Sequence, residues 1–279
     1  MIRSYLKVFL RNWLAWSAVY FGWAATANGQ VIAHRDFDVL QVAPARASDD
    51  GVERASAIKR IVESTNRFRR DEARGQLRPN NKLAEAAQEF AEYMARTDRY
   101  GHEADGRTPA ERVLARGYEY CLLAENIAMR YSTAGYETEP LADGFVQGWI
   151  DSPEHRKNML DPDVTQIGVG LAMSDESGRY YGVQIFARAK SEAIEFAVVN
   201  RTRIDVEYEL GDQMFSLPAR MTRTHSRCRP PELTVPLSQQ LSQQKPQTIA
   251  ARNGGRYVIE QGGEGVLRLE VATDSGRQP

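Results

Sequence analysis

The pattern of apolar residues predicts helices in the chain after residue 51. Apolar positions recur at helical spacing over residues 52–68, 81–98 and 141–151, which predicts three helices with one buried face each. Thr108-Pro109-Ala110-Glu111 predicts the start of a further short helix. Threonine caps it, proline occupies its first position, and glutamate completes a capping box. Gly117 ends this helix.

The period then changes from helical spacing to strict alternation. Residues 167–173 and 181–185 alternate apolar with small or polar residues, and a polar turn at 174–178 separates them, so they predict a β-hairpin. Gly168 and Gly170 place the smallest residues on one face, where another element packs closely. Helices before and beside this small sheet predict an α+β fold in which helices cover both faces of the sheet.

Residues 191–279 have a different pattern of apolar and polar positions. Alternation predicts strands at 194–198, 204–208, 257–259 and 266–271, and the Gln- and Ser-rich stretch 238–247 predicts a loop between them. We expect residues 191–279 to form a small β-sandwich-like accessory domain.

The first 27 residues have the pattern of a secretory signal peptide. A basic start without acidic residues precedes the apolar stretch 13–25, and Ala25-Thr26-Ala27 offers small residues for cleavage. The alternative is an uncleaved anchor, but a membrane span needs about twenty apolar residues. We therefore predict a signal peptide (1–27), a linker (28–51), a globular domain (52–190) and the accessory domain (191–279). We expect the mature chain to have no integral membrane span and to be secreted or periplasmic.

Composition and charge narrow the function classes. The chain of 279 residues is 42% hydrophobic and 26% charged with a net charge of −1, which is ordinary for a soluble globular protein and gives no basis for nucleic-acid binding. Two cysteines exclude a disulfide-dense scaffold and a four-cysteine zinc site. In an oxidising compartment Cys121 and Cys228 either form a disulfide or remain two buried thiols, and the sequence leaves both open.

Three residues between 101 and 186 are candidates for chemistry. His102 follows a helix-ending glycine, Glu125 lies in Ala124-Glu125-Asn126-Ile127-Ala128, and His155 falls in the first turn of a helix capped by Ser152. The positive end of that helix disfavours a protonated imidazole, and a neutral histidine can bind a metal or accept a proton. Two histidines and a carboxylate match the ligand count of an open zinc site, but they lack local metal-ligand spacing. The alternative is a set of partly buried polar residues with structural roles.

Five ordered segments of residues 66–190 resemble the CAP superfamily, the sperm-coating-protein-like extracellular domain, in its short bacterial form. They are His102 with Gly106, Pro109, Glu111 and Arg112; Glu125-Asn126-Ile127-Ala128; Trp149 to Leu160; Ile167-Gly168-Val169-Gly170; and Val183-Gln184-Ile185-Phe186. The resemblance implies an α-β-α sandwich with a large cleft, in which His102, Glu125 and His155 fill three of four polar places. Ser152 stands where animal and plant members have a second glutamate, and Ala124 stands where many members have glycine.

The resemblance implies a family but not a reaction, so three hypotheses stay open. The favoured one is a cleft that binds a lipid, glycan or peptide of the cell envelope or the extracellular space. The alternative is a metal-assisted, peptidase-like hydrolase, in which His102 and His155 hold a divalent metal such as zinc and Glu125 acts as base. In the third, the basic stretch from Arg220 to Arg229 contacts an acidic envelope polymer, unless it is simply a solvated loop or strand edge.

Two aromatic residues near these motifs have an expected structural place. Trp149 shares the inner face of the helix 141–151 with Phe145 and Val146, which predicts a core side chain. Tyr118 follows Gly117 and either lines the cleft or caps the core, and we favour the core.

Overall fold

The structure is a computed structural model that describes residues 52–235, 246–263 and 266–272. The predicted signal peptide and linker lie outside these residues, and so does most of the predicted loop 238–247. None of the helices in the described ranges combines the length and the apolar character that a membrane span requires.

The first part of the described chain alternates helices with the strands of one sheet. Its elements in chain order are α1 (Arg54–Asp71), β1 (Arg78–Pro79), α2 (Asn81–Thr97), α3 (Pro109–Ala115), β2 (Tyr120–Arg130), α4 (Thr138–Asp151), α5 (Pro153–Leu160), β3 (Gln166–Met173) and β4 (Tyr180–Ala189). The strands lie in the order β1-β3-β4-β2, with β3, β4 and β2 antiparallel.

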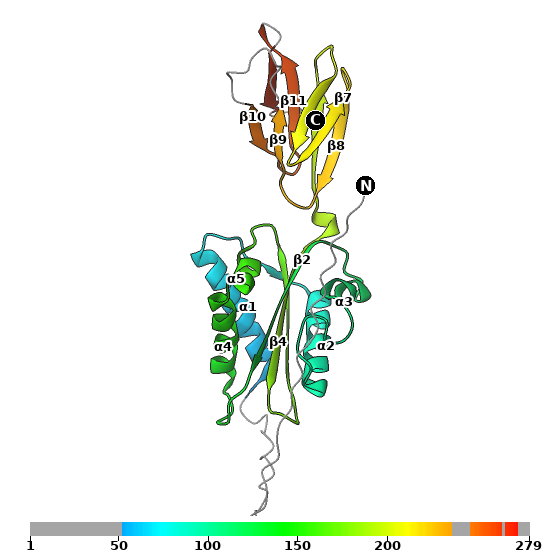
Figure 1. Ribbon diagram of the computed structural model, residues 1–279. Helices are drawn as coiled ribbons and strands as arrows, with labels where there is room; N and C mark the ends of the chain where they lie inside the picture. Colours follow the sequence, from blue (N-terminus) through cyan, green and yellow to red (C-terminus); the bar gives the residue numbers. More distant parts are fainter. Residues whose placement is uncertain (1–51, 236–245, 264–265, 273–279) are drawn as a thin grey trace, which may run out of the picture. The chain divides into compact units, whose positions relative to one another are not determined.

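Helices cover both faces of this sheet (Figure 1). On one face α1, α4 and α5 pack on Ile167, Val169 and Phe186. On the other face α2 and α3 pack on Val183 and Ile185. This arrangement is an α-β-α sandwich, so the predicted fold class is confirmed.

The glycines of β3 explain how closely α2 approaches the sheet. A Cβ atom on Gly168 would lie 2.2 Å from the backbone carbon of Leu83, and one on Gly170 would lie 2.3 Å from that of Ala87. Any side chain at either position would push the helix away from the sheet. The sheet face on which the sequence predicted close packing is therefore the face that α2 packs against.

The second part of the chain is built from two further sheets. A short 3₁₀ helix (Lys190–Glu192) follows β4 and precedes β5 (Ile194–Asn200), β6 (Val206–Leu210), β7 (Gln213–Leu217), β8 (Thr222–Arg227), β9 (Glu232–Val235), β10 (Gln247–Ala250), β11 (Arg256–Gln261) and β12 (Leu267–Val271). In the described residues the sheets have the orders β10-β9-β6-β7 and β12-β11-β5-β8, and side chains of both share one apolar core. The predicted sandwich-like unit is therefore present, and the division at residue 190 stays a prediction.

The elements predicted from local signals are present, and several strands are additional. The helices, the capping box of Thr108 and the hairpin all form as expected. Trp149 and Tyr118 are buried, so both core predictions are confirmed. The sequence patterns did not predict β2 or the strands β7 to β10. The basic stretch from Arg220 to Arg229 contains the edge strand β8, which agrees with the strand-edge interpretation.

Cys121 and Cys228 form a disulfide, with their Cα atoms 5.3 Å apart. It links β2 to the segment after β8, across a sequence separation of 107 residues. The next residue, Arg229, forms ion pairs of 2.6 Å with Asp161 and 2.7 Å with Asp163, which follow α5. Two neighbouring residues of the second part thus bind β2 and the end of α5, the two elements that carry Glu125 and His155.

Candidate functional site

His102 and Glu125 lie in direct contact, although 23 residues separate them in sequence. The loop after α2 carries His102, and Gly101 before it adopts a φ of 143°, a conformation that disfavours other residues. Glu125 lies in the middle of β2. The imidazole Nδ1 is 2.8 Å from the carboxylate Oε1, and the carboxylate side chain is buried while half of the histidine side chain is exposed.

Arg112 of α3 holds the Glu125 carboxylate from the interior. Its Nη2 donates to both carboxylate oxygens, at 3.0 and 2.9 Å, and to the carbonyl of His102 at 2.9 Å. Its Nη1 donates to Asp105 at 2.9 Å, and the guanidinium lies 3.5 Å from the ring centroid of Phe90. A buried ion pair of this kind needs added hydrogen bonds to offset desolvation, and this cluster supplies them.

The carboxylate also determines which nitrogen of His102 is available. A carboxylate only accepts hydrogen bonds, so Nδ1 carries the proton and donates it to Glu125. In the neutral form of this ring Nε2 bears the lone pair, on a side chain that is half exposed. Glu125 therefore orients His102, and both of its oxygens are already engaged.

His155 is brought to the same region by α5. Burial, and then the positive charge that His102 carries when it is protonated, lower the pKa of His155 below its usual value, which favours the neutral ring at pH 7. Asn126 of β2 donates to the His155 carbonyl at 3.1 Å, and Asn158 donates to the Asn126 side-chain oxygen at 2.9 Å. These bonds fasten α5 to β2 beside Glu125.

Two separate pockets are lined by successive residues of β2, so His102 and Glu125 lie in one pocket and His155 in the other, and we refer to the two pockets together as the β2 groove. The first, of about 370 Å³, is lined by His102, Glu125, Leu123, Tyr120, Thr108 and Pro109 among others. The second, of about 500 Å³, is lined by His155 together with Tyr100, Tyr131, Tyr136, Arg130 and Ser152 among others, and we call it the tyrosine pocket. From Leu123 to Met129 the strand advances by about 20 Å, so the two pockets are spread over about that length of β2.

The donor set does not fit a catalytic zinc centre, which needs three protein ligands and an open position. Among the residues that the structure describes, no group of three or more His, Cys, Asp or Glu side chains is placed to hold a metal ion. Glu125 is committed to Arg112 and His102 and does not act as a third ligand. A metal held by His102 and His155 alone stays a prediction.

Sequence patterns singled out the three polar residues but not their supports. Arg112, Asn126 and Asn158 lie inside the quoted motifs, yet no spacing rule connects them with one another. Arg112 follows the capping box of Thr108 and precedes the buried Val113, and this place in a short core-facing helix was the available signal.

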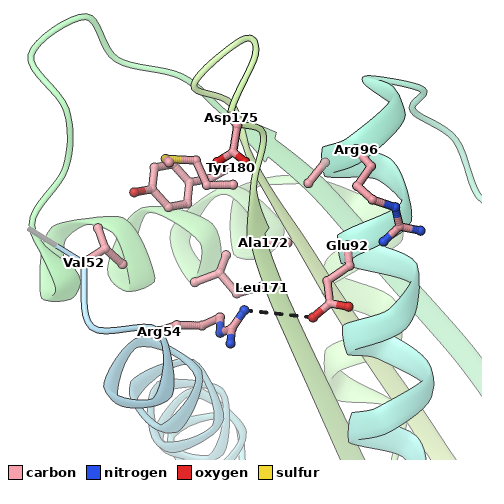
Figure 2. Close-up of a pocket in the computed structure, with 10 residues that line it drawn as sticks. Val52, Arg54, Glu92, Arg96, Leu171, Ala172, Asp175 and Tyr180 are labelled. Carbon is pink, nitrogen blue, oxygen red and sulfur yellow. Dashed lines mark ion pairs between the residues drawn. The ribbon is translucent and has the colours of Figure 1, made fainter. Parts of the chain in front are cut away.

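A third pocket, of about 380 Å³, lies between the start of α1, the second half of α2 and β3 (Figure 2). Arg54, Glu92, Arg96 and Asp175 line it above an apolar floor that includes Leu171. Arg54 and Glu92 form an ion pair at 3.9 Å. Charges of both signs therefore face one another within this pocket.

Residues 62–186 match a family model described as "CAP: Cysteine-rich secretory protein family". An uncharacterized protein of Bacillus subtilis (strain 168), YkwD, is 28% identical over 131 residues, which are 47% of this chain and 47% of that protein. The chain thus spans about half the length of this curated relative.

Solved structures are similar over about half of the chain. An outer surface protein from Borrelia burgdorferi is 19% identical with a TM-score of 0.42, over 48% of this chain and 93% of that one. An extracellular protein containing an SCP domain from Bacillus anthracis is 25% identical with a TM-score of 0.40, over 48% of this chain and 41% of that one.

Proposed function

We propose that the chain acts outside the cytoplasm as a binding module, since residues 62–186 match the model of the cysteine-rich secretory protein family. Its ligand, a lipid, glycan or peptide of the cell envelope or the extracellular space, lies in the β2 groove. The predicted signal peptide agrees with this location.

This proposal rests on one observation, the fixed orientation of the His102 imidazole. Arg112 and Glu125 fix the imidazole so that a lone pair on Nε2 is available at the side of an open groove. The neutral ring of His155 adds a second polar group farther along the same groove. Few, well-oriented polar groups in a mostly preformed pocket are typical of ligand sites.

The same contacts favour binding over the hydrolase alternative. A metal-assisted hydrolase of the kind considered above needs Glu125 as the base that activates water. Both oxygens of Glu125 accept hydrogen bonds from Arg112, and Oε1 also accepts one from His102. A carboxylate held in this way supports an orienting role.

Histidine NMR tests the proposal on the full chain, because its four histidines give few signals. The probes are phosphatidylglycerol vesicles, tetragalacturonate, chitotetraose and tetra-alanine. We expect at least one probe to shift the His102 and His155 ring signals while the buried His225 signal stays unchanged.

The controls separate binding from catalysis. The shifts are expected to disappear in His102→Ala with His155→Ala. If no probe moves either signal, the binding function is rejected for these ligand classes. Probe turnover that needs added zinc and is lost in His155→Ala would establish the hydrolase instead.

A further inference from the structure

We propose that the tyrosine pocket binds an acidic saccharide, whose sugar ring stacks on exposed tyrosine rings and whose carboxylate pairs with Arg130. This inference rests on the binding function proposed above and names the ligand class for one end of the β2 groove.

Exposed aromatic rings gather at this pocket. Tyr100 is 51% exposed and Tyr131 is 56% exposed, among the most exposed large apolar-bodied side chains in the described residues. The Tyr100 hydroxyl donates to the Ile127 carbonyl at 3.2 Å, and Tyr136 packs edge-on against Tyr180 with centroids 5.7 Å apart. Rings held in this way lose little entropy when a flat, C–H-bearing sugar face stacks on them.

Arg130 supplies a positive charge that no carboxylate of the described residues neutralises. It lies against α4 where Gly144 and Gly148 leave room, since a Cβ atom on Gly144 would come within 3.0 Å of its Cζ. Its Nη2 donates to the Gly144 carbonyl, and its guanidinium lies 5.9 Å from the ring centroid of Phe145. Among the described residues no Asp or Glu forms an ion pair with Arg130, and none lines the pocket.

The pocket of Figure 2 shows the opposite arrangement. There Arg54 already has Glu92 as partner, and Asp175 lines the same pocket. A ligand carboxylate would have to compete with these protein carboxylates. In the tyrosine pocket the ligand itself supplies the missing negative charge, and arginine pairs with a carboxylate in a two-bond geometry.

The remaining polar groups fit the hydroxyls of a sugar better than an acyl chain. Ser152 and the neutral His155 line the pocket together with the tyrosines. Trp149 also lines it, and its buried Nε1 has no hydrogen-bond acceptor among the described residues. Donors and acceptors spread around an open pocket recognise hydroxyls, whereas an acyl chain needs an enclosed apolar channel.

Isothermal titration calorimetry on the full chain compares matched ligands. Tetragalacturonate carries the ring and the carboxylate, its carboxyl-reduced form carries the ring alone, and hexanoate carries the carboxylate alone. N-acetylmuramic acid tests a second source of an acidic sugar. We expect at least one acidic sugar to bind at least tenfold more tightly than the reduced oligosaccharide and hexanoate, with affinity that falls as salt rises.

Variants locate the binding. Arg130→Met keeps the aliphatic stem and is expected to lower acidic-sugar affinity at least tenfold and to remove the preference over the reduced form. Tyr131→Ala is expected to lower the affinity at least fivefold. Arg96→Met, at the pocket of Figure 2, is the matched control and is expected to leave the affinity unchanged. Arg130→Lys keeps the positive charge, and we expect it to retain part of the preference for the acidic over the reduced oligosaccharide. A loss in Arg130→Met together with this partial retention would show that the missing charge, and not a folding defect, causes the loss.

Three results would overturn the inference: equal binding of acidic and reduced oligosaccharides, unchanged affinity in Arg130→Met, or an equal loss in Arg96→Met. If vesicles, chitotetraose or tetra-alanine move the His102 and His155 signals while neither acidic sugar binds, the inference fails and the binding function stands. If no probe binds at all, both fail.

Discussion

His102 and His225 each belong to a polar cluster against a sheet, yet the two clusters are built in opposite ways. Around His102 an ion pair between Arg112 and Glu125 lies inside, and half of the imidazole side chain faces solvent. Around His225 of β8 the neighbours are aromatic: Phe196 stacks at 5.4 Å, Phe215 packs edge-on at 5.0 Å, and the Tyr208 hydroxyl lies 2.7 Å from Nε2. Only the first cluster leaves a ring nitrogen available to a ligand.

The difference shows which surroundings leave a histidine available for function. A charged support in the interior orients the ring and leaves its outer nitrogen available. An aromatic cage satisfies the ring and closes it off, so His225 is 5% exposed. The same residue type is therefore presented to solvent in one part of the chain and packed into a core in the other.

Breaking the support of His102 should have the largest effect on stability. Arg112→Met leaves the Glu125 carboxylate buried without its partner, which costs about 3–5 kcal/mol of unfolding free energy. Urea unfolding followed by circular dichroism measures it. The control is Arg116→Met, which breaks the exposed pair with Glu89 and should cost less than about 1 kcal/mol. Similar losses in both variants would refute the distinction between interior and surface pairs.

Removing the disulfide tests whether the two parts that carry these clusters stabilise one another. Cys121→Ser with Cys228→Ser frees a loop of 107 residues, and the chain-entropy estimate is roughly 4.7 kcal/mol as an upper figure, with 2–4 kcal/mol typical. The melting temperature should fall in the double variant, and a reductant should lower it in the parent chain but not in the variant. A reductant-insensitive parent would contradict the coupling.

Acid should weaken the aromatic cage of His225. Burial, with Arg227 and Arg223 adding, lowers the pKa of His225 to about 4, against an unfolded value near 6.5. The contribution of the neutral His225 to the free energy of unfolding is therefore complete above pH 6.5. It is lost as the pH falls towards 4, and the loss is about 3 kcal/mol at most. Amide hydrogen exchange of β5 and β8 at several pH values measures it. The rates are divided by the intrinsic exchange rate at each pH to give protection factors, and in His225→Phe these protection factors should lose most of their pH dependence.

The smallest effect on stability is expected for the exposed histidine itself. His102→Ala leaves the Arg112–Glu125 pair intact, so unfolding should change by less than about 1 kcal/mol. Thermal unfolding measures this, and the histidine NMR titration above reports the lost binding. A loss as large as that of His225→Ala would show that His102 is a structural residue as well.

Local sequence signals predicted the elements that have one buried face. The helices and the β3–β4 hairpin show regular periods because one side of each packs against the core and carries apolar residues, while the other side carries smaller or polar residues. β2 escaped prediction since α3, α4 and α5 pack against it from both faces of the sheet, so apolar residues occur on both of its sides. β8 escaped because a single fully buried residue, His225, faces its core among polar neighbours.

The sequence by itself determined the α+β fold, the close-packed face at Gly168 and Gly170, and the identity of the three candidate polar residues. Tertiary structure alone decided that Arg112 binds Glu125 and that Cys121 meets Cys228. It also decided that Arg130 lies over Gly144 with no carboxylate partner among the described residues. Helices, caps and turns depend on neighbours a few residues apart, which a pattern can read. Pairing partners and pocket walls depend on residues brought together across tens of positions, and their distances arise only when the sheet and helices have packed.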